Sequence, residues 1–96
     1  MAKREGFFRH DGVRYRFAVW ESEGAEAAPV VLLHGFAQSA ASWDGIAEFL
    51  GRTRSVVALD LVGHGGSDRP EGADAYALGA QGEMLLAYLA SPVGVA

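Results

Sequence analysis

Two polar, glycine-rich segments of this chain carry the side chains that could do chemistry. They span residues 33–39 and 59–68. Histidine, aspartate and serine side chains serve in enzymes as general bases, nucleophiles and metal ligands. The side chains of these types that we consider as candidates in the two segments are His34, Asp60, His64 and Ser67.

The two histidines, His34 and His64, are candidates for a catalytic base or a metal ligand. Neither H-x-x-x-H nor H-x-E spacing relates them to each other or to Asp60, so we predict no metal site. A catalytic role for His34 stays open, but we favour a structural role in shaping its loop. For His64 we favour a hydrogen bond within its own loop.

The glycines of the second segment, Gly63, Gly65 and Gly66, suggest a phosphate-binding loop. The pattern G-x-x-x-x-G-K-S/T is missing, however, and no lysine follows Lys3. We therefore expect neither a bound nucleotide nor any other cofactor.

Each polar segment follows a short apolar run that must position it. Val30–Leu33 and Val56–Leu59 are continuously apolar, which is typical of strands buried on both faces of a parallel sheet. In an open parallel sheet, ligands bind outside the carboxyl ends of the strands. We therefore expect both segments to lie on one functional rim.

The N-terminal part of the chain predicts a hairpin. Apolar and polar residues alternate over residues 13–20, and an Asp11-Gly12 turn signal separates them from the aromatic pair Phe7 and Phe8. An alternating strand after a turn signal, with aromatic residues before the turn, is typical of two antiparallel strands.

Two further stretches predict helices. The first has Ser42 as its N-cap and Gly51 as its C-cap. Its apolar positions fall on one face, namely Trp43, Ile46, Ala47 and Leu50. The second helix has a leucine stripe that we expect to pack in the core rather than against a partner, namely Leu78, Leu85, Leu86 and Leu89.

The order of these elements indicates an α/β fold. Three strands, a helix, a strand and a helix follow one another, with a long loop over residues 60–76. Apolar strands that alternate with helices predict an N-terminal hairpin followed by parallel strands with right-handed crossover helices.

Composition narrows the class of protein. The 96 residues suffice for one small domain, and 8 basic against 12 acidic residues argue against a nucleic-acid or anionic-membrane surface. The absence of cysteine excludes disulfides, thiolate metal sites and cysteine nucleophiles. No apolar run approaches the roughly 20 residues of a membrane helix, and the N-terminus lacks the apolar region of a signal peptide. We expect a soluble cytoplasmic protein.

The motifs together resemble the first part of an α/β-hydrolase. A His-Gly pair follows a buried strand, Ser-Trp opens a helix, and D-x-x-G-x-G-x-S follows the next strand. The residues that carry this resemblance are His34, Gly35, Ser42, Trp43, Asp60, Gly63, His64, Gly65 and Ser67. Within that superfamily, the segments look most like the menaquinone-pathway 2-succinyl-6-hydroxy-2,4-cyclohexadiene-1-carboxylate synthase group. Val62 is a departure, because that group usually carries proline there.

The resemblance implies a mechanism. The family uses a serine on a G-x-S-x-G turn, activated by a histidine that an acid orients, in the chain order serine, acid, histidine. One backbone N–H that binds the oxyanion comes from the loop after the third strand, which corresponds to Phe36. The complete protein would act on a small-molecule substrate.

The chain itself lacks these three catalytic residues. The nearest approach to the serine turn is Gly65-Gly66-Ser67-Asp68-Arg69, which fails at Arg69, and no histidine follows His64. We therefore expect residues 1–96 to be the N-terminal part of a single α/β-hydrolase domain that ends before the nucleophile turn and is inactive alone.

Alternative functions stay open at this point. The chain could instead be a stand-alone, non-catalytic module that binds a partner through an open sheet edge, or a separate chain could complete the site. An incomplete sheet would expose an edge and an apolar face, so we expect self-association or marginal stability.

Overall fold

The computed structural model describes residues 3–22, 29–35 and 38–90. Four strands form one sheet, in the order β1 (Lys3–His10), β2 (Val13–Trp20), β4 (Val56–Leu59) and β3 (Val30–Leu33). β2 pairs antiparallel with both β1 and β4, whereas β3 and β4 are parallel. The predicted hairpin and the predicted parallel pair are therefore both confirmed, and they join into one mixed sheet.

The hairpin turns at Asp11 and Gly12, whose φ angles are 52° and 78°. Positive φ at both central residues of a two-residue turn suits the right-handed twist of the strands, and aspartate followed by glycine tolerates it best. This turn brings β2 alongside β1 over their whole lengths.

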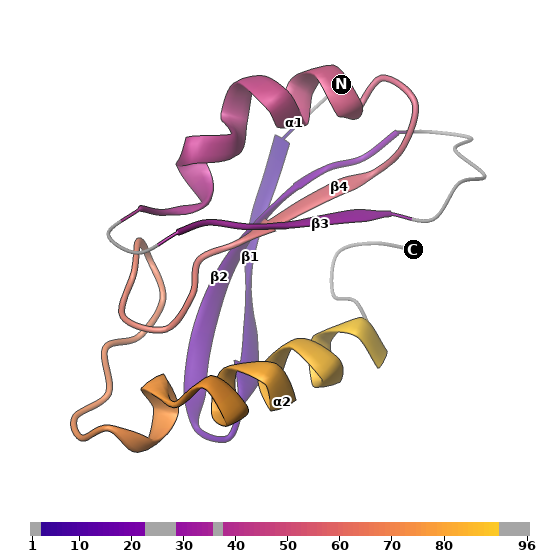
Figure 1. Ribbon diagram of the computed structural model, residues 1–96. Coiled ribbons are helices and arrows are strands. Elements are labelled where there is room, and N and C mark those ends of the chain that lie inside the picture. The colour runs from indigo at the N-terminus through magenta and orange to yellow at the C-terminus, as the bar shows by residue number, and fades with distance from the viewer. Residues whose placement is uncertain (1–2, 23–28, 36–37, 91–96) are drawn as a thin grey trace.

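Helices cover both faces of the sheet (Figure 1). The 3-10 helix η1 (Ala40–Trp43) leads into α1 (Asp44–Leu50) on one face. The 3-10 helix η2 (Asp74–Tyr76) precedes α2 (Leu78–Ala90) on the other face. None of these helices has the length and hydropathy needed to span a membrane.

The predicted cap at Ser42 is wrong, because Ser42 lies inside η1. The N-cap of η1 is Ser39, and that of α1 is Trp43; neither side chain makes a capping bond. Gly51 does take the C-cap position of α1, with its N–H donating to the carbonyl of Ala47. Its φ of −64° is ordinary for a helix, so the position does not require glycine.

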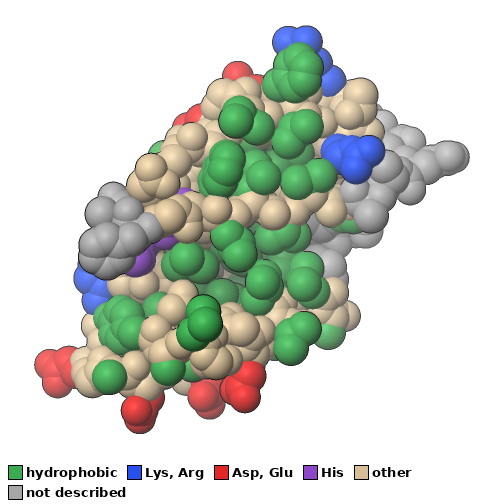
Figure 2. Space-filling model, viewed as in Figure 1, with side chains coloured by type: hydrophobic (Ala, Val, Ile, Leu, Met, Phe, Trp, Pro, Cys, Tyr) green, Lys and Arg blue, Asp and Glu red, His purple; other side chains and the backbone are tan. Residues whose placement is uncertain are grey.

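The two parallel strands differ in burial. β4 is fully buried along its length, as predicted. The expectation of equal burial for β3 is wrong: Val30, Val31 and Leu32 are half-buried and Leu33 is 39% exposed. β3 is an edge strand of the described sheet, and hydrophobic side chains gather over it between α1 and α2 (Figure 2).

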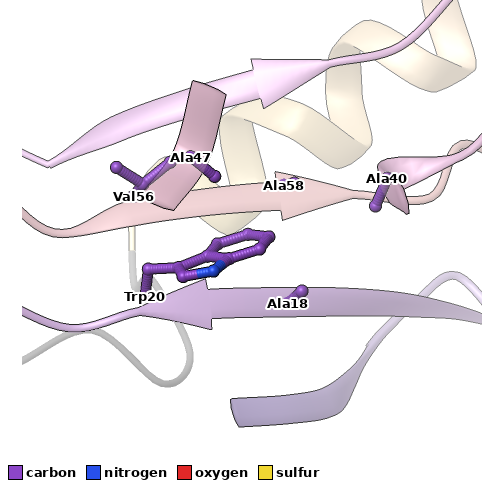
Figure 3. Packing of buried hydrophobic residues seen from close by; sticks show 6 residues of the cluster. All are labelled: Ala18, Trp20, Ala40, Ala47, Val56 and Ala58. Atoms are coloured by element: carbon purple, nitrogen blue, oxygen red, sulfur yellow. The ribbon is translucent and has the colours of Figure 1, made fainter. Parts of the chain in front are cut away.

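The core lies in two layers that β4 separates. On the α1 side, Trp20 fills the space among five small side chains (Figure 3). These are Ala18, Ala40, Ala47, Val56 and Ala58. On the α2 side, Tyr88 packs against Phe8 with ring centroids 5.4 Å apart and an interplanar angle of 87°. Burial raises the pKa of Tyr88 to about 12, because the phenolate would lose its hydration there.

The predicted leucine stripe of α2 is not its core face. Met84 and Tyr88 are the buried residues of α2, and Leu85 is half-buried beside them. The other three leucines lie largely exposed: Leu78 at 87%, Leu86 at 70% and Leu89 at 49%. The apolar face of α1 is also narrower than predicted, since Ile46 is 53% exposed. In both helices the side chains that pack inward are set by the position of the sheet.

Candidate active-site rim

The two polar segments leave the sheet side by side. Leu33 and Leu59 are register partners at the ends of the parallel strands β3 and β4. His34 and Asp60 therefore begin their loops at the same rim, as expected for a ligand-binding edge. Both side chains are buried, at 5% and 0% exposure.

His34 joins the two loops. Its Nε2 accepts a hydrogen bond from the backbone N–H of Leu61 at 2.9 Å. The proton must then lie on Nδ1, which donates to the carbonyl of Gly35 at 2.7 Å. Both ring nitrogens are thus engaged with backbone, and this leaves neither free to take a proton from a substrate.

His64 lies beside His34, with ring centroids 4.9 Å apart. Its Nδ1 is 2.9 Å from the carbonyl of Val62, within its own loop. The rim thus carries a pair of imidazoles packed against each other. No group of three or more metal-ligating side chains occurs among residues 3–22, 29–35 and 38–90.

Asp60 connects three parts of the chain through its carboxylate. Oδ1 accepts from the N–H of Ala40 at 2.6 Å, at the start of η1. Oδ2 accepts from the N–H of Gly66 at 2.9 Å and from the Arg16 guanidinium at 3.2 Å. Burial of a charge is stable only with such compensation, because an unpaired buried carboxylate costs several kcal/mol.

Arg16 is the residue of this site that the sequence analysis missed. It lies on β2, 44 positions before Asp60, and it also forms an ion pair with Glu5 on β1. Arginines within a largely apolar strand, at positions 14 and 16, followed later by a lone aspartate after a buried strand, are the signal that could have suggested the pair.

Gly65 is required by this carboxylate. Its φ of 50° lies in the left-handed region, and a Cβ there would overlap the Asp60 side chain. Gly63 is under a similar restraint, with a φ of 76° and the Tyr76 ring 2.7 Å from where a Cβ would stand. The spacing of these glycines therefore serves the packing of the loop.

Ser67 continues the pairing of this loop with β2. Its Oγ–H donates to the Asp60 carbonyl at 2.6 Å, and Oγ accepts from the Arg16 N–H at 2.8 Å. Asp68 then donates its backbone N–H to the Arg14 carbonyl at 2.8 Å and accepts the Arg14 N–H through Oδ2 at 2.9 Å. Ser67 is 3% exposed and occupied on both sides, so its place in the fold is that of a structural serine.

The remaining candidates are spread out. Ser42 is exposed on η1, and Gly35 donates its N–H to Gln38 Oε1 at 3.1 Å. Trp43 packs against the core layer beneath α1, and its buried Nε1 has no hydrogen-bond partner among the described residues. Phe36, the predicted oxyanion donor, lies outside the described residues.

An apolar groove of about 370 Å³ opens beside His34. It separates the end of β3 from α2, and the sequence analysis did not foresee it. The residues that line it include Leu33, His34, Leu61, Leu78, Met84 and Leu85. A groove of this size and polarity at the carboxyl end of a parallel sheet could hold the apolar part of a small molecule.

Comparisons with known proteins agree with this geometry. The α/β hydrolase fold family matches residues 28–95. The chain is similar to fluoroacetate dehalogenase of a Burkholderia species, with 41% identity over 54 residues, which are 56% of this chain and 18% of that protein. It is also similar to a Bacillus subtilis protein assigned as 2-succinyl-6-hydroxy-2,4-cyclohexadiene-1-carboxylate synthase, with 43% identity over 60 residues, which are 62% of this chain and 21% of that protein. The resemblance to this synthase group is thereby confirmed.

Solved structures show the same similarity in three dimensions. The crystal structure of an epoxide hydrolase from Vigna radiata superposes with a TM-score of 0.81 and 27% identity, and the match covers 93% of this chain and 28% of that one. The matches to the two curated relatives span about a fifth of their length. With the sheet order, the rim and the family match in agreement, this chain belongs to the α/β hydrolase fold family.

Proposed function

We propose that this chain provides the oxyanion-binding loop and one wall of the substrate cleft of an α/β-hydrolase active site, and that the nucleophile, the acid and the catalytic histidine come from outside residues 1–96. The hydrogen bond from Leu61 N–H to His34 Nε2 carries this proposal. It holds the start of the loop after β3, at His34, against the loop after β4, at the edge where ligands bind in parallel sheets. Phe36 follows His34 by two positions in the sequence.

The hydrogen bonds of the other rim residues support the proposal that the catalytic residues come from outside residues 1–96. A serine nucleophile needs a neighbouring base and an exposed Oγ, whereas Ser67 is buried and bonded to backbone on both sides. Asp60 already compensates Arg16 and two N–H groups. These side chains make the rim rigid, which is what preorganised backbone donors require.

The substrate is a small molecule with an electrophilic carbon, such as an ester or a related acyl compound. The relatives carry the names of a dehalogenase, a synthase and an epoxide hydrolase, so proteins of different reactions share this segment. We infer that the segment supplies the common scaffold for a serine hydrolase or a related carbon–carbon lyase or synthase. Residues outside this segment would select which reaction the protein catalyses. The synthase reaction of the menaquinone pathway is one of the candidate reactions.

The first test is the intact mass of the natively expressed protein, together with the reading frame after codon 96. A longer product with a G-x-S-x-G turn that hydrolyses p-nitrophenyl acetate is the expected result. A native mass of 10.1 kDa with no hydrolysis would overturn the proposal for this chain.

The second test addresses the oxyanion donor in that longer product. Phe36→Pro removes the backbone N–H, and we expect kcat to fall by about 10²–10³-fold. Phe36→Ala is the matched control, because it removes the side chain and keeps the N–H. Equal losses in the two variants, at unchanged melting temperature, would exclude a role for this N–H.

An alternative function is a non-catalytic module that binds a partner, or a second copy of itself, through the edge of β3. One observation favours it: β3 is an uncharged edge strand with Leu33 partly exposed, whereas the opposite edge strand, β1, carries Lys3, Arg4 and Glu5. Charged residues protect sheet edges from pairing, so of the two edges β3 is the one open to association.

A further inference from the structure

A second pocket, of about 300 Å³, lies at the hairpin turn and away from the rim. It lies among the turn at Asp11, the loop before η2 and the first half of α2, and it shares no lining residue with the groove beside His34. We call it the acidic pocket. Its polar lining residues are His10, Asp11, Tyr15, Glu71, Asp74 and Glu83.

The charges of the acidic pocket are uncompensated. Its four carboxylates, on Asp11, Glu71, Asp74 and Glu83, form no ion pair with any Lys or Arg side chain of the described residues. The carboxylates of Glu5, Glu21, Asp44, Asp60 and Asp68, in contrast, are all paired. Figure 2 shows acidic side chains gathered along the end of the molecule where α2 begins. Such a concentration of negative charge attracts a cation.

Tyr15 adds a buried tyrosine with a polar hydroxyl to the lining of this pocket. Its ring packs with Val13, Val62 and Met84, so the residue is only 2% exposed. No described residue makes a hydrogen bond to its hydroxyl, and the residue lines the acidic pocket. Burial, assisted by the charge of Asp11, raises the pKa of Tyr15, which keeps the phenol neutral. A neutral phenol oxygen can accept a hydrogen bond from a bound cation.

The spacing of the carboxylates decides which cation fits. A metal ion needs several ligands around one point, and no three acidic or histidine side chains of the described residues meet in that way. Charges spread around a pocket suit a longer molecule whose positive groups are also spread. We propose that the acidic pocket binds a small organic cation with two or more ammonium groups, such as a linear polyamine, with the hydroxyl of Tyr15 and the surrounding carboxylates as its acceptors.

The test is calorimetric titration of spermidine into the natural chain at its full expressed length, at low ionic strength. Tyr15→Phe removes the acceptor and, because the hydroxyl has no partner among the described residues, should leave the melting temperature unchanged. We expect it to weaken spermidine binding several-fold, and the double variant Asp74→Asn/Glu83→Gln to weaken it by about tenfold or more.

Glu48→Gln is the matched control for charge. Glu48 is an exposed carboxylate on α1, outside the pocket, and it forms no ion pair with another described residue. Removal of the Glu48 charge should change spermidine affinity by less than about twofold, because a single distant charge is largely screened. Magnesium chloride at the same concentration should not displace spermidine. Three results would each overturn the proposal. The first is that Glu48→Gln weakens spermidine binding as much as the double pocket variant does. The others are that magnesium binds as tightly as spermidine, or that Tyr15→Phe binds spermidine as tightly as the unchanged protein.

Discussion

The imidazole Nε2 of His34 and the backbone N–H of Leu61 lie 2.9 Å apart, across 27 positions of sequence. This hydrogen bond joins the loop after β3 to the loop after β4. Together with the carboxylate of Asp60, it makes one rigid rim from segments that meet only because their strands are parallel neighbours.

Replacement of His34 should therefore destabilise the protein. His34→Ala leaves the N–H of Leu61 without its acceptor, and we expect the free energy of unfolding to fall by about 1–3 kcal/mol. Urea unfolding followed by circular dichroism measures this loss. His10→Ala is the matched control, since His10 is half-buried and lies in the hairpin rather than on the rim. A loss no larger than that of the control would contradict the structural role of His34.

The pair of Asp60 and Arg16 should behave as a buried ion pair. Asp60→Asn removes the charge that compensates the guanidinium, and we expect a loss of about 3 kcal/mol. The control is Asp44→Asn, because Asp44 pairs with Lys3 at the surface and its side chain is 51% exposed. The control should cost less than about 1 kcal/mol.

A double-mutant cycle with Arg16→Met sharpens this prediction. If the two side chains stabilise each other, the loss in the double variant is smaller than the sum of the single losses. Additive losses would show that Asp60 acts through the N–H groups of Ala40 and Gly66 alone.

Alkaline pH should destabilise the protein through Tyr88. The pKa of this phenol is about 12 in the folded chain and 10.0 as its reference value. Between these pH values the unfolded state loses its proton while the folded state keeps it, so the free energy of unfolding falls as pH rises. The stabilisation is complete below about pH 10, and about 2–3 kcal/mol is lost by about pH 12.

The pH dependence can be assigned by substitution. Tyr88→Phe should flatten the fall in stability above pH 10, and Tyr15→Phe should flatten it further, because the pKa of Tyr15 is also raised. Chemical unfolding at pH 9, 10 and 11 provides the measurement. An unchanged slope in Tyr88→Phe would refute the assignment.

Self-association through β3 is tested by a charge at that edge. We expect the 96-residue chain to sediment as a concentration-dependent mixture, and Leu33→Lys to shift it toward monomer, because lysine on an edge strand opposes pairing. Phe7→Lys is the control on the opposite edge strand, where the Phe7 side chain is 49% exposed. A wild-type chain that is monomeric at all concentrations would rule out this association.

The hairpin and the buried strand β4 could be predicted from sequence because their signals are local. Asp11-Gly12 favours the left-handed backbone that a tight turn needs, whatever surrounds it. Val56–Leu59 is apolar at every position, and a strand with a helix on each face buries every side chain. The family motifs around His34 and Asp60 were likewise sufficient to predict the fold class, which the family match confirms.

The tertiary structure decided the features that depend on distant neighbours. Val30–Leu33 has the same composition as a central strand, yet its place at the edge of the described sheet leaves it half-buried. In α2 the inward face follows the direction of the sheet, so Met84 and Tyr88 are buried while Leu78 and Leu86 are exposed. The partnership of Arg16 with Asp60 spans 44 positions. Local patterns specify which backbone a segment can adopt, but the side chain that compensates a buried charge is selected only when the strands pack together.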